Sequence, residues 1–160
     1  MQSEPQTTTG WMVLAQHQSG QWLAMSYPEP HCPVVFVCET LALEIAAELL
    51  GDLVLAAIVL EVAVPVEAAT SSDWNLCSEA DRSASEEETR QRLARPAQTV
   101  GYLVIASAAG ERHCLVVCRD GRPEVFPTAA DAEEHQALLT TEGAVGAVWP
   151  VLYREKATTP

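Results

Sequence analysis

The sequence predicts an α+β fold of two tandem strand–strand–helix–strand (ββαβ) units with antiparallel sheets, related by a pseudo-two-fold axis. The units cover residues 10–67 and 101–155. In each unit a glycine precedes a short apolar strand, a turn and a second strand follow, and a helix leads into a final apolar strand. Because few residues are identical, a chance likeness between two ordinary α+β units is the alternative.

The first unit opens with a hairpin. Residues 11–15 form an apolar run, residues 18–21 have turn chemistry, and residues 21–27 form a second strand. Three prolines then predict a loop, because proline cannot donate a hydrogen bond to a sheet. Residues 34–38 form a short apolar run that leads into the helix.

The helix of the first unit is the best-specified element of the chain. Thr40 is the expected N-cap, and Gly51 occupies the expected C-cap position. The apolar side of the helix contains Leu41, Ile45 and Leu49. The strand that follows, residues 53–66, is almost continuously apolar, so we expect it to be central and covered on both faces.

The second unit repeats this order. Its strands are expected at residues 102–106, 112–118 and 144–153. Residues 119–122 carry a strong turn signal, and residues 128–131 form a capping sequence for a helix that ends near Leu139. Pro150 lies within the last strand, so part of that strand should lie at an edge or a bulge.

We expect each helix to lie over one face of its sheet. The two units should either continue one sheet or pack sheet to sheet, with strands 53–66 and 144–153 near their junction. Residues 1–9 and 156–160 are expected to be flexible tails.

An acidic helical linker, residues 68–100, joins the two units. Its helix begins with acids, continues into arginines and stops before a proline, as the helix dipole favours. Four-residue spacing pairs Glu86 with Arg90, and Glu88 with Arg92. This helix has little to bury, so we expect a solvated spacer or a segment that folds against a partner.

The formal net charge of −13 is unevenly distributed. Residues 1–81 contain eleven acids and no Lys or Arg, whereas the remaining residues hold nine basic and eleven acidic side chains. A protein surface with this much negative charge repels phosphate backbones and anionic membranes, which argues against direct nucleic-acid binding. No apolar run is long enough to span a bilayer and no signal peptide is evident, so the expected compartment is the cytoplasm.

The five cysteines and four histidines form no recognised catalytic or metal-binding pattern. An odd cysteine count without a secretory signal favours buried thiols over a disulfide framework. A mixed sulfur–nitrogen zinc shell is the alternative, and its candidate ligands are His31, Cys32, His113, Cys114 and Cys118. We expect no cofactor, because the phosphate-loop, dinucleotide-binding and nucleophile-elbow motifs are absent.

These observations favour a non-enzymatic acidic protein-interaction module: an inhibitor, immunity-type or adaptor protein that binds a basic protein surface. The candidate contact residues are Trp22, Glu29, Glu39, Glu44 and Glu48. For Trp22, packing in the core is the interpretation that we favour. One rival is a small ligand- or metal-binding domain, or an enzyme, that uses Cys and His side chains in the cleft between the units. Another is a structural subunit of a larger assembly.

Overall fold

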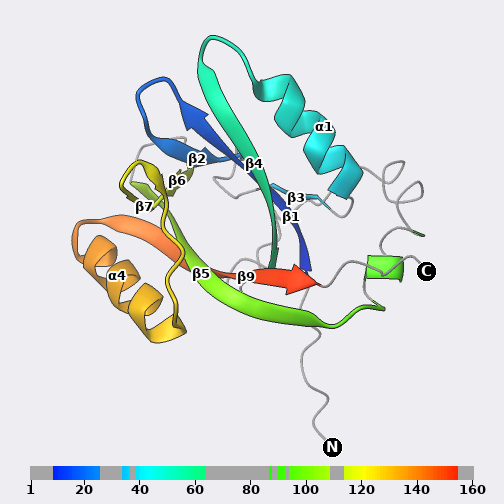
Figure 1. Cartoon of the computed structure of the whole chain (residues 1–160). Helices are drawn as coiled ribbons and strands as arrows, with labels where there is room; N and C mark the ends of the chain where they lie inside the picture. The colour runs from blue at the N-terminus through cyan, green and yellow to red at the C-terminus, as the bar shows by residue number, and fades with distance from the viewer. Residues whose placement is uncertain are drawn as a thin grey trace, which may run out of the picture.

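The computed structural model describes residues 9–25, 34–36, 39–63, 87, 90–92, 94–108 and 114–154. The predicted α+β class with an antiparallel sheet is confirmed (Figure 1). The main sheet contains β1 (Thr9–His17), β2 (Trp22–Ala24), β3 (Val35–Phe36), β4 (Val54–Ala63), β5 (Ala97–Ala108), β6 (Cys114–Val116) and β9 (Ala144–Arg154). A separate hairpin is formed by β7 (Cys118–Arg119) and β8 (Arg122–Pro123). The outer helices are α1 (Glu39–Leu49) and α4 (Ala129–Thr141).

The main sheet closes on itself. Its strands follow the order β2-β6-β5-β9-β4-β1, and β2 also pairs with β1, which completes a six-stranded antiparallel barrel. The two halves of the chain meet at two strand pairs, Leu23 with Leu115 and Val62 with Val151. The second pair joins β4 and β9, so the expected junction strands are confirmed. Of the two arrangements considered, the continuous sheet is the one observed.

The barrel interior is filled from both halves of the chain. Side chains alternate along each strand, so every second residue points inward. From β1 these are Met12 and Leu14, from β5 Leu103 and Ile105, and Trp149 of β9 lies among them with 1% of its surface exposed. The two halves therefore share one core.

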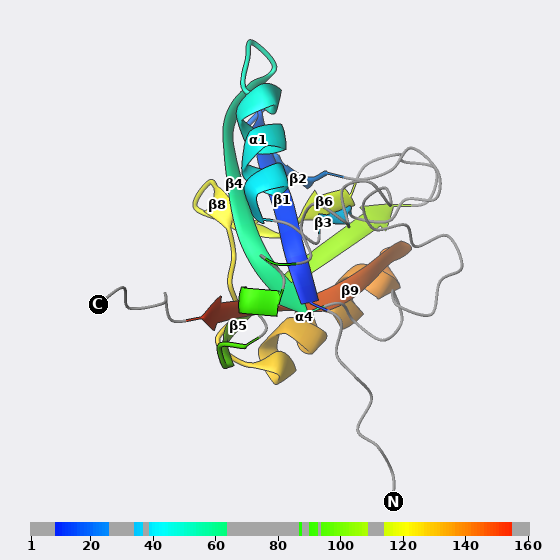
Figure 2. The same cartoon turned by 90° about the vertical axis from the view of Figure 1, so that its right-hand side faces the viewer.

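Both helices pack on the outside of the barrel. In Figures 1 and 2, α1 runs along β1 and β4, while α4 lies against β5 and β9. Alanines form the innermost contact: Ala42 and Ala46 of α1 and Ala132 of α4 are buried, which lets each helix approach its sheet closely. None of the described helices is both long and apolar enough to cross a membrane.

The helix boundaries follow the expected caps with small differences. α1 begins at Glu39, one residue before the predicted cap at Thr40. α4 is capped as predicted, because the side chain of Thr128 accepts a hydrogen bond from the Asp131 amide. It extends two residues beyond the expected end at Leu139.

The glycine that opens each half is required by close packing. A Cβ atom on Gly10 would overlap the side chain of Val35, and a Cβ atom on Gly101 would overlap the side chain of Val125. In both places the residues just before the helix of that half lie directly against the glycine. A register irregularity follows Thr99 on β5, opposite the region of Pro150 on β9, where a bulge or an edge was expected.

The expectation that strand 53–66 is covered on both faces is wrong for its first half. β4 pairs with β9 at a single position, Val62 with Val151, and the preceding part of β4 runs beyond the end of this contact. Leu55 lies on the strand face that packs against α1 at Ala57, yet it is 59% exposed, whereas Val62 is completely buried. Apolar composition predicted the strand but not where its cover ends.

Candidate functional site

The charged side chains on the outer side of α1 are all acidic. Glu44 and Glu48 lie one turn apart and are exposed, and α1 contains no Lys or Arg. Neither carboxylate forms an ion pair with any other residue that the structure describes. Glu39 lies at the start of the same helix and is half-buried, whereas Glu29 lies outside the described residues. Like charges four residues apart on a helix repel each other by a few tenths of a kcal/mol, roughly, so this arrangement does not serve helix stability.

Exposed leucines border these acids where α1 ends and β4 begins. Leu43 lies on α1, and Leu50 is the first residue after this helix and leads directly into the turn to β4. Leu53 and Leu55 follow this turn. Leu55 shares its strand face with Ala57, which packs against α1. We call Leu43, Leu50, Leu53 and Leu55 the leucine patch.

Trp22 lies in the core, as favoured above, and not on the surface. Its side chain is 6% exposed and belongs to the barrel interior. The indole Nε1 donates a hydrogen bond of 2.8 Å to the carbonyl oxygen of Gly121, at the tip of the β7–β8 hairpin. Trp22 therefore holds this hairpin against the barrel, which removes it from the set of exposed contact residues.

The candidate metal ligands that can be placed do not form a metal site. Within the described ranges, no three His, Cys, Asp or Glu side chains gather as a metal ion would require. Cys114 is buried in the barrel interior, whereas Cys118 lies on the exposed hairpin. His31, Cys32 and His113 fall outside the described residues.

The Cys118 thiol is poorly suited to nucleophilic chemistry. Desolvation raises the pKa of this thiol above its ordinary value, and a hydrogen bond with the backbone of Trp22 opposes the shift only in part. Its sulfur donates a hydrogen bond of 3.1 Å to the carbonyl oxygen of Val116. Because the thiolate is the reactive form, a raised pKa leaves less of it at neutral pH.

A buried ion cluster lies at one end of the barrel, and sequence reasoning did not find it. Glu61 of β4 accepts hydrogen bonds from Arg92 at 2.5 Å and from Arg154 of β9 at 2.7 Å. These side chains are only 3%, 5% and 9% exposed, respectively. The Arg92 guanidinium also lies over the ring of Trp11, at 5.7 Å from its centroid, and donates to the hydroxyl of Thr9.

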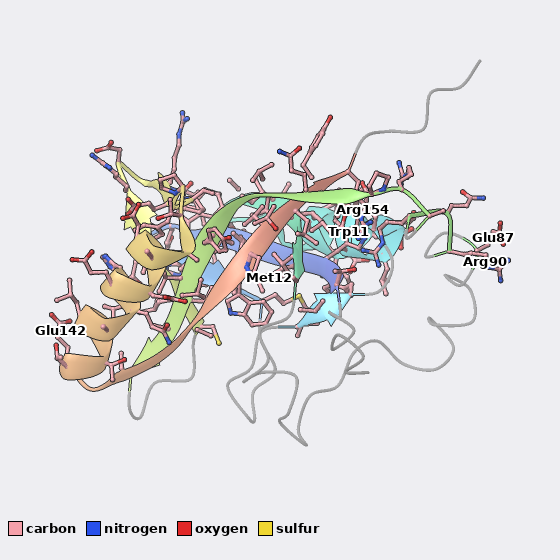
Figure 3. All side chains as sticks on the ribbon, turned by 90° about the horizontal axis from the view of Figure 1, so that it is seen from below. Trp11, Met12, Glu87, Arg90, Glu142 and Arg154 are labelled. Carbon is pink, nitrogen blue, oxygen red and sulfur yellow. The ribbon has the colours of Figure 1, made fainter. Side chains whose placement is uncertain are left out.

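The cluster ties the inter-unit segment to the barrel. Arg154 donates to the carbonyl oxygens of Arg92 and Arg95, so this strand residue also holds the backbone that follows the linker helix. Figure 3 labels Trp11 and Arg154 at this end of the molecule, with Glu142 at the far end near α4. The prediction that the linker helix is a solvated spacer is therefore wrong at Arg92, whose buried side chain contacts Glu61. Glu86 and Glu88, the predicted partners of Arg90 and Arg92, lie outside the described residues. The one available signal was Glu61 itself, a lone acid inside an apolar strand.

A surface pocket of about 560 Å³ lies beside the β7–β8 hairpin. Its lining residues are Arg119, Asp120, Arg122, Pro123, Glu124, Val125 and Pro127. The lining mixes both signs of charge, and Arg119 already lies 3.8 Å from Glu124. It contains neither histidine nor cysteine, so it does not match the expected Cys/His cleft.

No protein-family model, curated protein or solved structure matches this chain.

Proposed function

We propose that this chain is a non-enzymatic interaction module whose first half binds a basic protein surface, as an inhibitor, immunity-type protein or adaptor does. The observation that carries the proposal is the outer side of α1, where Glu44 and Glu48 are exposed and no described cation neutralises them. Complementary charge attracts a basic partner over long distances and raises its association rate.

The distribution of cations supports this proposal. Arg92 and Arg154 are held by Glu61 inside the ion cluster, which carries a charge of +1 and is hidden from solvent. The formal net charge of the whole chain is −13, so all residues outside the cluster together carry a net charge of −14. Internal use of arginines leaves the surface more acidic than the composition indicates.

We also infer that the two ββαβ halves are duplicated copies related by a pseudo-two-fold axis. The two junctions support this inference, because Leu23 pairs with Leu115 and Val62 pairs with Val151. A two-fold axis that passes between two antiparallel strands pairs the position on the axis with its own counterpart, and Leu23 with Leu115 and Val62 with Val151 would be these positions in the two copies. The leading glycines, Gly10 and Gly101, support it too.

Backbone hydrogen bonds repeat between the halves. The Met25 amide donates to Val13, and the Val117 amide donates to Val104. A second backbone hydrogen bond also repeats, since the amide of Val34 donates to Met25 and the amide of Glu124 donates to Val117. An experimental structure in which residues 9–63 do not superpose on residues 97–154 would contradict the duplication.

Charge reversal on the two helices tests the proposed function. The variant E44K/E48K changes exposed acids on α1, and the matched control E133K/E134K changes two exposed acids on α4. Immobilised wild-type chain and both variants are incubated with extract of the native host, and the retained proteins are identified. We expect the α1 variant to lose basic proteins that the α4 variant retains. Equal retention by both variants would refute an acidic site on α1.

A further inference from the structure

The leucine patch distinguishes the first half of the chain from the second. The helices can be aligned on their buried alanines, Ala42 and Ala132, and the final strands on the junction pair of Val62 and Val151. With this alignment the positions of Leu43, Leu50, Leu53 and Leu55 correspond to Glu133, Thr140, Glu142 and Ala144. The second half forms the same elements with polar or small residues there, so the fold does not require leucines at these positions.

The patch is bordered by acids of a single sign. Glu44 and Glu48 lie between Leu43 and Leu50 in the sequence, and Asp52 lies in the turn between α1 and β4. Several exposed leucines close together in the sequence, with acids beside them, are typical of a protein-binding site. A second copy of this chain would bring the same acids against one another, so charge disfavours it as the occupant.

We propose that the leucine patch anchors an amphipathic helical segment of a partner, with apolar residues on one side and Lys or Arg on the flanks. This inference rests on the proposed function and names the partner chemistry for the same site. Leu43 on α1 and Leu50 just after its end would give a helix that lies alongside α1 two exposed apolar contacts. Leu53 and Leu55 extend the apolar surface onto β4, and the acids contact the basic flanks of the partner.

Two synthetic peptides separate apolar anchoring from simple charge attraction. The first is an amphipathic helix of about 18 residues, or five turns, with Leu on one side and Lys on the other. The second has the same lysines with Ser in place of every Leu. Affinity for the full chain is measured by calorimetry at about 0.1 M and about 0.5 M salt, because salt screens exposed charges. We expect the Leu–Lys peptide to bind more tightly and to retain most of its affinity at high salt.

Variants locate the binding. L50S/L53S/L55S should weaken the Leu–Lys peptide by about 100-fold, since three leucines about half exposed would be buried by it. The matched single variants are L53S and L138S, whose leucines are 61% and 60% exposed on different halves of the molecule. L53S should weaken binding about fivefold, and L138S should have no effect. Hydrogen exchange provides a second readout, with protection on binding expected at residues 50–55.

Each outcome separates the inference from the function on which it rests. If both peptides bind equally and L50S/L53S/L55S changes nothing, apolar anchoring is overturned while charge attraction stands. If the Leu–Lys peptide binds but E44Q/E48Q has no effect at low salt, the acidic interaction site is overturned. If neither peptide binds, both proposals fail. A dimer in sedimentation that L50S/L53S/L55S abolishes would assign the patch to a second copy and overturn the proposed partner.

Discussion

Replacing Glu61 by Gln tests the ion cluster most directly. The change removes the carboxylate that holds two guanidinium groups, each less than 10% exposed, and leaves their charges facing each other with little solvent. Removing one partner of a buried ion pair costs about 3–5 kcal/mol. Arg154 keeps its backbone acceptors and Arg92 keeps the Trp11 ring, so we expect the lower end of this range, about 3 kcal/mol. For a chain of this size that loss lowers the melting temperature by about 10 °C.

The assay is urea denaturation followed by tryptophan fluorescence, with E87Q as the matched control. Glu87 also pairs with an arginine, Arg90, but these side chains are 66% and 73% exposed, so its loss should cost under about 0.5 kcal/mol. Replacing the whole cluster by E61L/R92L/R154M should cost less than E61Q, because no buried charge is left without a partner and only neutral oxygens, such as the carbonyl oxygens of Arg92 and Arg95, lose a donor. If E61Q costs no more than E87Q, the buried cluster does not hold the linker to the barrel.

Three further outcomes are expected from single sites. Gly101→Ala should destabilise the fold by about 1–3 kcal/mol in urea denaturation, because the added Cβ atom has no room. Gly51→Ala is the control, since the space around Gly51 is open and its effect should stay below about 1 kcal/mol. Equal effects of the two substitutions would contradict the close packing at Gly101. Trp22→Phe removes the donor to the Gly121 carbonyl oxygen, so it should cost at least about 1 kcal/mol and speed hydrogen exchange of the Glu124 amide, which donates to Val117 at the base of the hairpin. Unchanged exchange would show that the indole does not hold the hairpin. The alkylation rate of Cys118, measured by mass spectrometry of its peptide, should reach half its maximum at a higher pH than for a free cysteine. The reason is the raised pKa of the thiol, which shifts formation of the reactive thiolate to higher pH. A half-maximal rate at a lower pH would refute the desolvation argument.

The elements of the fold could be predicted from local sequence patterns, whereas the closure of the barrel could not. Hydrophobic periodicity located both helices and the long strands, and Thr128 was recognisable as a cap. The Asp120–Gly121 turn was recognisable as well, since both residues have positive φ angles, as a tight hairpin requires. Closure depends on pairs such as Leu23 with Leu115, which are far apart in the sequence and carry no local signal.

The surface was predicted in part, for the same reason. Charge counting found the acids of α1, because an exposed helix side is visible in its own sequence. It could not find that Arg92 and Arg154 are withdrawn from the surface, since their shared partner, Glu61, lies 31 and 93 residues away, respectively. The apolar composition of the strand predicted that Leu55 is covered, because composition does not show which part of a sheet face a helix covers.

The two strand pairs that join the halves of the chain, β2 with β6 and β4 with β9, affect how the chain folds. Neither half closes a ring by itself, so each would leave unpaired strand edges and an incomplete interior until the other half is present. Folding must therefore bring together segments from opposite ends of the sequence, which raises the contact order and slows the search. During synthesis the first half emerges with its sheet edges unpaired. Its acidic side chains, without any Lys or Arg in residues 1–81, should then reduce aggregation, because nascent chains of like charge repel one another.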